Sequence, residues 1–513
     1  MSLVRRVNAD PPVVLNKRRS GILLPITALP SEFGIGDLGP GAYWFADFLV
    51  SARQSLWQIL PLNPTDAAYQ HSPYSSFSAF AGNPWLISPA LLLEDDLLAE
   101  EDLQDKPDFP PAQVDYAQAI ACKEKLLDKV YEYFRHDKRL RKEFRIFQKD
   151  NEPWLRDYAL FTAIKKSLGG VIWTDWPDEL KNRNRDALYD FELAFADQVD
   201  KARFLQFIFF RQWKKLRAYC HQGGVYLIGD MPIYVNWDSA DAWAGAENFK
   251  IDAHHKPLGV AGVPPDYFSG TGQRWGNPVY DWEKLKASKY AWWIGRIRHN
   301  LDMYDYLRID HFRGFVQCWE IPAHEPLASS GKWVEAPARD FLGTLQKTFK
   351  PLPVIAEDLG IITDDVREVM KAYGLPGMKV LLFAFGEDLQ KHPYLPHNFD
   401  HHCVVYTGTH DNNTVRGWFD HEAGLKEKEN FFTYIGRVVD GKDIHWAFIE
   451  LALMSKADTA IVPMQDVLGL GQEARFNKPA TTRGNWQWRV LEGAVDRDVV
   501  QRLRELTQRS HRT

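Results

Sequence analysis

The stretch Tyr306-Leu-Arg-Ile-Asp-His-Phe-Arg-Gly-Phe315 decides the fold and points to the chemistry of this chain. It is typical of a short apolar and β-branched strand that ends in an acid, Asp310, with Arg308 two residues before it. Because alternate residues of a strand share a face, we expect the guanidinium of Arg308 to lower the pKa of Asp310 and keep that carboxyl ionised at neutral pH. A buried Asp–Arg pair that only closes a strand would give the same pattern.

The same arrangement recurs at three more predicted strand ends. Acids close, or directly follow, the apolar stretches Val225–Asp230, Val354–Glu357 and Val404–Asp411. Four acids in equivalent positions favour a functional cluster over an isolated structural pair.

The spacing of apolar stretches predicts eight strands with helical segments between most of them. The predicted strands are Gly21–Ile26, Leu56–Leu60, Val225–Asp230, Tyr306–Asp310, Val354–Glu357, Met378–Leu382, Val404–Tyr406 and Ala460–Pro463. This α/β order, repeated eight times, predicts a (β/α)8 TIM barrel, in which active sites lie at the carboxyl ends of the strands. The four acids would then meet on one rim.

The expected organisation is one large domain with two insertions. Residues 1–19 are expected to form a loosely ordered N-terminal arm, and residues 20–513 the catalytic barrel. A mostly helical insertion is predicted at about 66–200, where helical periodicity replaces the strand pattern. A second insertion at about 236–290 is rich in Trp, Gly and Pro and is expected to supply lid and acceptor-side loops.

The composition excludes several classes of function. The chain has 513 residues, 45% of them hydrophobic, and its net charge of −6 argues against nucleic-acid binding. No apolar stretch is long enough to span a membrane. The four cysteines are scattered and form no C-x-x-C pair, which is typical of buried thiols in a reducing compartment. We therefore expect a cytoplasmic protein, with a plastid form whose transit peptide has been removed as the alternative.

Aromatic residues are unusually numerous, with 19 Trp, 20 Tyr and 30 Phe. Aromatic rings can stack on the C–H faces of sugars, although they occur more often in cores. Several carboxylates in one pocket suit either a divalent metal or the cleavage of a glycosidic bond.

The neighbours of the acids separate these two chemistries. A metal site would not favour the guanidinium of Arg308 among its ligands, whereas an ionised Asp310 suits a nucleophile. Glu357 has no adjacent base, and apolar surroundings with nearby acids would raise its pKa, as a proton donor requires. Asp411, preceded by His410, suits the binding of sugar hydroxyls. We expect no metal and no cofactor.

Ten motifs then carry a resemblance to a known family. They are Gly21-Ile-Leu-Leu-Pro, Gly34-Ile-Gly-Asp-Leu-Gly, Ser72-Pro-Tyr-Ser-Ser-Phe-Ser-Ala-Phe-Ala-Gly-Asn-Pro, Gly229-Asp-Met-Pro-Ile, Val263-Pro-Pro-Asp-Tyr-Phe-Ser, Gln273-Arg-Trp-Gly-Asn-Pro, Arg308-Ile-Asp-His-Phe-Arg-Gly, Ala356-Glu-Asp-Leu-Gly, Gly408-Thr-His-Asp-Asn-Asn-Thr and Gly484-Asn-Trp-Gln-Trp-Arg. From about Gly21 to Arg489 the chain resembles the 4-alpha-glucanotransferases of the amylomaltase, or disproportionating enzyme, type, which is glycoside hydrolase family 77 in the alpha-amylase clan.

This resemblance implies roles for the acids. Asp310 would be the nucleophile that forms a β-glucosyl-enzyme, and Glu357 the acid/base. Asp411 would stabilise the transition state by holding the ring hydroxyls at the cleavage point, assisted by His410 and Arg308. Asp230 would support the same sugar.

The resemblance also implies substrate contacts outside the acids. The stretch Gly262–Ser269 is a candidate lid that would keep water from the intermediate, in which Tyr267 and Phe268 supply apolar cover and Asp266 is a further contact. Tyr74 and Trp275 are candidate acceptor-side stacking platforms, and Gln273 a polar contact. For each of them ordinary loop structure or packing is the alternative.

Two departures from the family pattern are Phe476 and Ala480, where Met and Gly are expected. Both are expected to lie on an outer loop that leaves the chemistry undisturbed.

The implied activity is the transfer of segments of alpha-1,4-glucans, such as maltooligosaccharides, to an acceptor 4-hydroxyl. Three alternatives stay open: an alpha-glucan hydrolase on the same scaffold, a Mg²⁺-dependent barrel enzyme of the enolase kind, and a non-catalytic glycogen- or starch-binding protein. The intact set of acids disfavours the last, since a binding protein needs no acid/base pair. The sequence leaves the oligomeric state, monomer or dimer, undecided.

Overall fold

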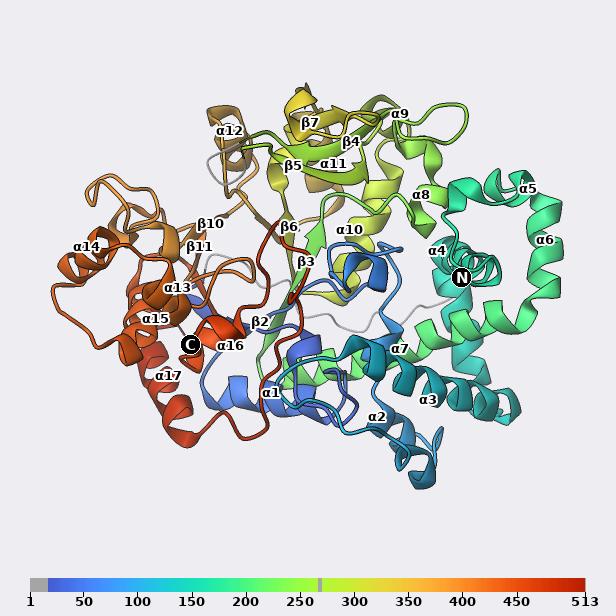
Figure 1. Ribbon diagram of the computed structural model, residues 1–513, viewed down its shortest axis with the longest axis horizontal. Coiled ribbons are helices and arrows are strands. Elements are labelled where there is room, and N and C mark those ends of the chain that lie inside the picture. Colours follow the sequence, from blue (N-terminus) through green and yellow to red (C-terminus); the bar gives the residue numbers. More distant parts are fainter. Residues whose placement is uncertain (1–16, 266–269, 513) are drawn as a thin grey trace.

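The structure is a computed structural model that describes residues 17–265 and 270–512. Its centre is a parallel sheet in the order β10-β11-β12-β1-β2-β3-β6-β9 (Figure 1). The strands are β1 Arg19–Leu23, β2 Leu56–Gln58, β3 Tyr226–Pro232, β6 Tyr306–Asp310, β9 Val354–Ala356, β10 Gly377–Val380, β11 Cys403–Tyr406 and β12 Thr459–Pro463. The Ala356 N–H in β9 donates to the carbonyl of Pro376, next to β10, at 2.9 Å. The sheet is a nearly closed (β/α)8 barrel, and all eight predicted strands are present.

The sequences of these short strands are almost continuously apolar, because a strand of a parallel barrel is buried on both faces. The helices around the barrel cover the outer face. Outside the insertion described next, the described helices are α1 Pro40–Ser51, α7 Ala196–Gln222, α8 Ala240–Ala244, α9 Trp282–Ala287, α10 Ala291–Met303, α11 Ala338–Thr348, α12 Asp364–Ala372, α13 Val415–His421, α14 Leu425–Ile435, α15 Ile444–Met454, α16 Met464–Val467 and α17 Arg497–Arg509. In α11, for example, Phe341, Leu342 and Leu345 are buried at helical spacing.

The segment between β2 and α7 is helical and projects to one side of the barrel (Figure 1). It contains α2 Pro89–Glu94, α3 Tyr116–His136, α4 Arg141–Ser167, α5 Asp178–Lys181 and α6 Arg185–Ala194. Stacked aromatic rings join it to the barrel helix α7, as in the pair Phe134–Phe204, whose ring centroids are 4.1 Å apart. The division of the chain into inserted subdomains stays a prediction.

A second sheet, antiparallel and four-stranded, lies above the barrel rim and was not predicted (Figure 1). It has the order β5-β4-β7-β8, with β4 Gly259–Val263, β5 Gln273–Pro278, β7 Gln317–Pro322 and β8 Lys332–Glu335. The expectation that the stretch from Gln273 is a loop is therefore wrong. The stretch forms a strand because β4 offers it a partner and β7 pairs with the other edge of β4.

The first described residues pack against the opposite end of the barrel. β1 begins at Arg19, two residues earlier than predicted, and the Arg18 guanidinium donates to carbonyl groups near the ends of α15 and α17. The arm was predicted at residues 1–19, and its residues 1–16 lie outside the described residues.

Candidate active site

The four predicted acids lie on one rim of the barrel, at the carboxyl ends of its strands. Asp230 lies in β3, Asp310 ends β6, Glu357 directly follows β9, and Asp411 lies in the loop after β11. The pairing of β3 with β6 places Asp230 opposite Arg308. The prediction that the acids share one rim is thereby confirmed.

Arg308 is the cation that organises this rim. Its side chain is 3% exposed, and its Nη1 donates to both carboxylate oxygens of Asp230 at 2.7 Å and lies 3.1 Å from Oδ1 of Asp310. The Tyr74 hydroxyl donates to Oδ2 of Asp230 at 2.8 Å. Burial lowers the pKa of Arg308, but Asp230 and Asp310 raise it further, so the guanidinium stays charged.

The pKa of Asp310 is raised to about 6, mainly because of burial. Arg308 lowers this pKa, whereas the charges of Asp230 and Asp411 raise it. The prediction of a lowered pKa is therefore wrong in direction, because Arg308 is shared with Asp230 and only partly offsets the loss of solvation. The ionised form still predominates at pH 7, and the side chain is 30% exposed, so a substrate can reach it.

The pKa of Glu357 is raised to about 8, by burial first and then by the charge of Asp310. Its two oxygens accept from the N–H groups of His311 and Leu359, each at 2.7 Å, and both bonds lower the pKa only in part. His311 directs its N–H to Glu357 from a left-handed conformation, with a φ of 52°. The proton of the acid pair therefore resides on Glu357 and the charge on Asp310, in the order predicted.

Asp411 is the most exposed of the four acids, with 44% of its side chain accessible. Its Oδ1 accepts from Nδ2 of Asn477 at 2.6 Å and lies 3.4 Å from Nε2 of His410. The ring of His410 is stacked on that of Tyr74, with centroids 5.1 Å apart. Asp411 is thus free to accept hydrogen bonds from a ligand on its exposed side.

Sequence reasoning noted Phe476 but missed the part that its neighbours Arg475 and Asn477 play in the site. Arg475 donates from Nη2 to the carbonyl of Asp411 at 2.8 Å, and the Asn477 N–H donates to the carbonyl of His410 at 3.1 Å. The expectation that Phe476 lies on an outer loop is wrong. Its side chain is 3% exposed and contacts the ring of Trp486, because it fills space behind the loop that bears Asp411. The local sequence indicates this role weakly: an aromatic residue, Phe476, stands between two polar residues that could face the site.

The predicted substrate contacts are placed in part. Tyr74 lies inside the acid cluster, where His410 covers one face of its ring. Trp275 is 38% exposed on β5, donates to Oε1 of Gln273 at 3.1 Å, and meets the ring of His311 edge to face at 4.8 Å. The Trp275 ring thus lies next to His311, whose N–H bonds Glu357, and is partly exposed. Asp266, Tyr267 and Phe268, and with them part of the predicted lid, lie outside the described residues.

Within the described ranges no group of three or more His, Cys, Asp or Glu residues could hold a metal ion. Two of the four acids, Asp230 and Asp310, pair instead with the guanidinium of Arg308. No described helix is long and apolar enough to cross a membrane.

Comparison with known proteins agrees with the family resemblance of the sequence motifs. Residues 24–493 match the family described as 4-alpha-glucanotransferase. The chain is 48% identical to the 4-alpha-glucanotransferase of Synechocystis sp., over 93% of this chain and 94% of that one. It is 46% identical to the enzyme of the same name from Aquifex aeolicus, over 93% and 96% of the two chains. The structure of an amylomaltase from Streptococcus agalactiae in complex with acarbose matches with a TM-score of 0.93 and 37% identity, over 97% of this chain and 100% of that chain.

Proposed function

The chain belongs to the 4-alpha-glucanotransferase family and is an enzyme of that type, and we propose that it transfers alpha-1,4-glucan segments by a double displacement at Asp310 and Glu357. The observation that carries this mechanism is the different setting of the two acids: Asp310 pairs with the Arg308 guanidinium at 3.1 Å, whereas Glu357 is bonded by backbone N–H groups and burial raises its pKa. Two carboxyl groups that differ in this way are what a retaining glycosidic reaction requires.

In the first step the carboxylate of Asp310 attacks the anomeric carbon of the donor sugar. A bond forms between that carbon and an oxygen of Asp310, while the bond to the departing 4-oxygen breaks and that oxygen takes the proton of Glu357. Arg308 stabilises the ionised Asp310 before the attack. Once Asp310 has formed the covalent bond, Arg308 and Asp230 remain as an ion pair with no net charge. The product is a glycosyl-enzyme and a shortened glucan.

In the second step Glu357, now a carboxylate, takes the proton from the 4-hydroxyl of an acceptor. The acceptor oxygen bonds to the anomeric carbon, and Asp310 leaves as a carboxylate. Two inversions restore the alpha configuration, and the enzyme returns to its starting protonation.

The remaining side chains bind the sugar at the cleavage point. Asp411 accepts hydrogen bonds from ring hydroxyls on its exposed side, with His410 beside it as a second polar group. Because positive charge develops at the anomeric carbon, the carboxylates of Asp411 and Asp310 also favour the transition state. Asp230 holds this arrangement through Arg308 and Tyr74.

Transfer requires that a sugar hydroxyl, and not water, reaches the intermediate. Trp275 and Gln273 are the proposed acceptor contacts, supported by the exposed indole beside His311. Asp266, Tyr267 and Phe268 are proposed as further contacts and cover on the strength of their sequence motif alone.

Incubation of the purified protein with maltotriose tests this function. Chromatography of all products is expected to give free glucose together with a ladder of longer maltooligosaccharides. Glucose and maltose alone would indicate hydrolysis, and no products at all would contradict the proposed reaction. Addition of EDTA is expected to leave the rate unchanged, in contrast to a Mg²⁺-dependent enzyme.

The partners proposed are alpha-1,4-glucans and maltooligosaccharides, and the relative's complex with acarbose agrees with an alpha-glucan site. We place the protein in the cytoplasm, since its four cysteines are free and buried, as is typical of a reducing compartment.

A further inference from the structure

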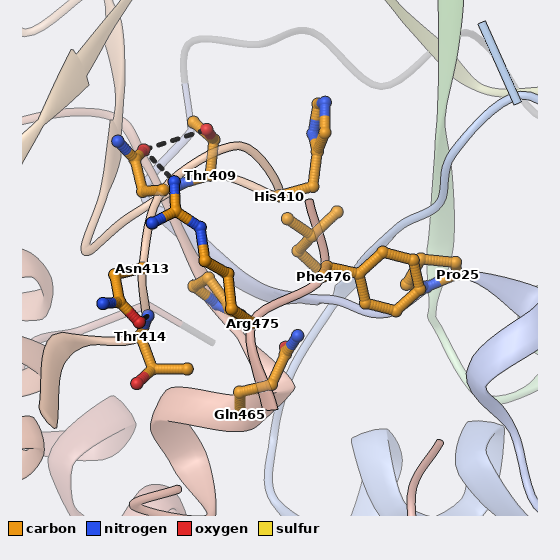
Figure 2. Close-up of a pocket in the computed structure, with 11 residues that line it drawn as sticks. Pro25, Thr409, His410, Asn413, Thr414, Gln465, Arg475 and Phe476 are labelled. Atoms are coloured by element: carbon orange, nitrogen blue, oxygen red, sulfur yellow. Dashed lines mark hydrogen bonds between the residues drawn. The ribbon is translucent and has the colours of Figure 1, made fainter. Parts of the chain in front are cut away.

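The loop of residues 407–414, called here the acid-bearing loop, joins β11 to α13 and carries His410 and Asp411. A cavity lies behind it, lined by Thr409, His410 and Thr414 of the loop and by Gln465, Arg475 and Phe476 from farther along the chain (Figure 2). Phe476 fills part of the space on this side, so packing and hydrogen bonds together set the position of the loop.

Inside the loop, one turn is held by Asn412. Its Oδ1 accepts from the N–H and the hydroxyl of Thr409, at 2.8 and 2.9 Å, as Figure 2 shows. These bonds fix the shape of the turn around Asp411 but not the position of the loop relative to the barrel.

The two ends of the loop meet on one carboxylate, that of Asp466. Its Oδ2 accepts from the hydroxyl of Thr407, the first residue after β11, at 2.6 Å. Its Oδ1 accepts from the N–H of Val415, the first residue of α13, at 2.7 Å. Asp466 belongs to α16, directly after β12, so it ties the loop to the neighbouring barrel strand.

This carboxylate is costly to keep. Asp466 is 1% exposed, and its oxygens accept from two neutral donors, the Thr407 hydroxyl and the Val415 N–H. Burial raises its pKa to about 6. A buried charge that only neutral donors compensate lowers stability, which argues that the residue serves a purpose other than stability.

We propose that Asp466 is a positioning residue: through Thr407 and Val415 it holds the acid-bearing loop so that His410 and Asp411 reach the sugar at the cleavage point. This inference rests on the proposed role of Asp411. It predicts that loss of Asp466 acts on turnover through Asp411, beyond any effect on folding.

The test compares Asp466→Ala, Asp466→Asn and Thr407→Val with a matched control, Asp305→Asn. Asp305 is also a nearly buried carboxylate that accepts a backbone N–H, that of Leu227; it pairs in addition with Arg217 and His221, and it lies just before β6, at the opposite end of the barrel. Steady-state rates with maltotriose and thermal unfolding are measured for each variant, and each variant is also combined with Asp411→Asn.

We expect Asp466→Ala to lower kcat/KM by about 10- to 100-fold, mainly through kcat, because small displacements of a binding group are costly in the transition state. Asp466→Asn should lose less, since its amide oxygen can still accept from Val415, and Thr407→Val should also lose activity. Asp305→Asn should lower the unfolding temperature with little change in kcat/KM. When Asp411→Asn is already present, adding Asp466→Ala should lower kcat/KM by less than about threefold.

Two results would overturn the inference. One is an activity of Asp466→Ala no lower than that of Asp305→Asn at equal loss of stability. The other is a full, additive loss in the Asp411→Asn background, which would leave the proposed function standing. Near-normal activity of Asp411→Asn alone would instead reject the proposed role of Asp411, and this inference with it.

Discussion

The two sides of the active site are built in opposite ways. On one side, Asp310 and Glu357 are held by strand ends and by backbone N–H groups, next to the buried cation Arg308. On the other side, Asp411 is 44% exposed on a loop that lies over a cavity and is tied by side chains from residues 466–477.

The difference follows from what each side does. The acid pair must keep its proton on one member, and only a rigid, poorly solvated setting raises the pKa of Glu357 well above that of Asp310. Asp411 has to accept hydrogen bonds from an incoming sugar, so it needs exposure. Substitutions on the first side are therefore expected to lower turnover by removing a reacting group. Substitutions on the second side are expected to lower it by displacing Asp411.

The largest effect is expected from Asp310→Asn. An amide cannot form the covalent intermediate, so turnover of maltotriose should fall below detection while thermal unfolding changes little. Product analysis by chromatography over long incubations checks this. Turnover near that of the unaltered enzyme would show that the nucleophile lies elsewhere.

Glu357→Gln comes next, with a loss of roughly a hundred- to ten-thousand-fold, because it removes general acid catalysis. With an activated donor such as a maltosyl fluoride, whose leaving group needs no proton, azide should restore turnover and yield a glycosyl azide, since this anion needs no base to attack the intermediate. The same azide treatment of Asp310→Asn serves as the control and should restore nothing through this route. Absence of rescue in Glu357→Gln would contradict the acid/base assignment.

The pH dependence of kcat/KM is expected to be bell-shaped. Asp310 must be ionised, so activity is lost as the pH falls through about 6, and Glu357 must be protonated, so activity is lost as the pH rises through about 8. These limits belong to the pair as a whole. Each limb should change by roughly tenfold per pH unit. In Glu357→Gln the basic limb should disappear, and its persistence would contradict the order of protonation.

The smallest effect concerns the exposed side. Ala480 has a φ of 61°, in the left-handed region where Gly is favoured. Ala480→Gly should stabilise the protein by up to about 1 kcal/mol, since relief of strain exceeds the entropy that Gly adds to the unfolded chain. Ala121→Gly, at an exposed position within α3, is the control and should destabilise by about 0.5–1 kcal/mol. Urea unfolding measures the change in the free energy of unfolding for both variants. A change of the same sign in both would contradict the strain at Ala480.

The barrel could be predicted because its strands are apolar runs with an acid at the end, a local pattern. The sheet of β4, β5, β7 and β8 could not, since Gly259–Val263 and Gln273–Pro278 are rich in Gly and Pro and become strands only through long-range pairing. The four acids could be predicted because each stands at the end of, or just after, such an apolar run. Asp466 and Asn477 were missed because each lies 51 or more residues beyond the groups that it bonds, so no local pattern links them.

The second sheet also limits how this enzyme could be re-engineered. β4 and β5 come from the connection between β3 and β6, whereas β7 and β8 come from the connection between β6 and β9. Because β4 pairs with both β5 and β7, the two connections on either side of the nucleophile strand form one module. Grafting one of them from a relative would leave an unmatched strand edge, so specificity would have to be transplanted with both connections together.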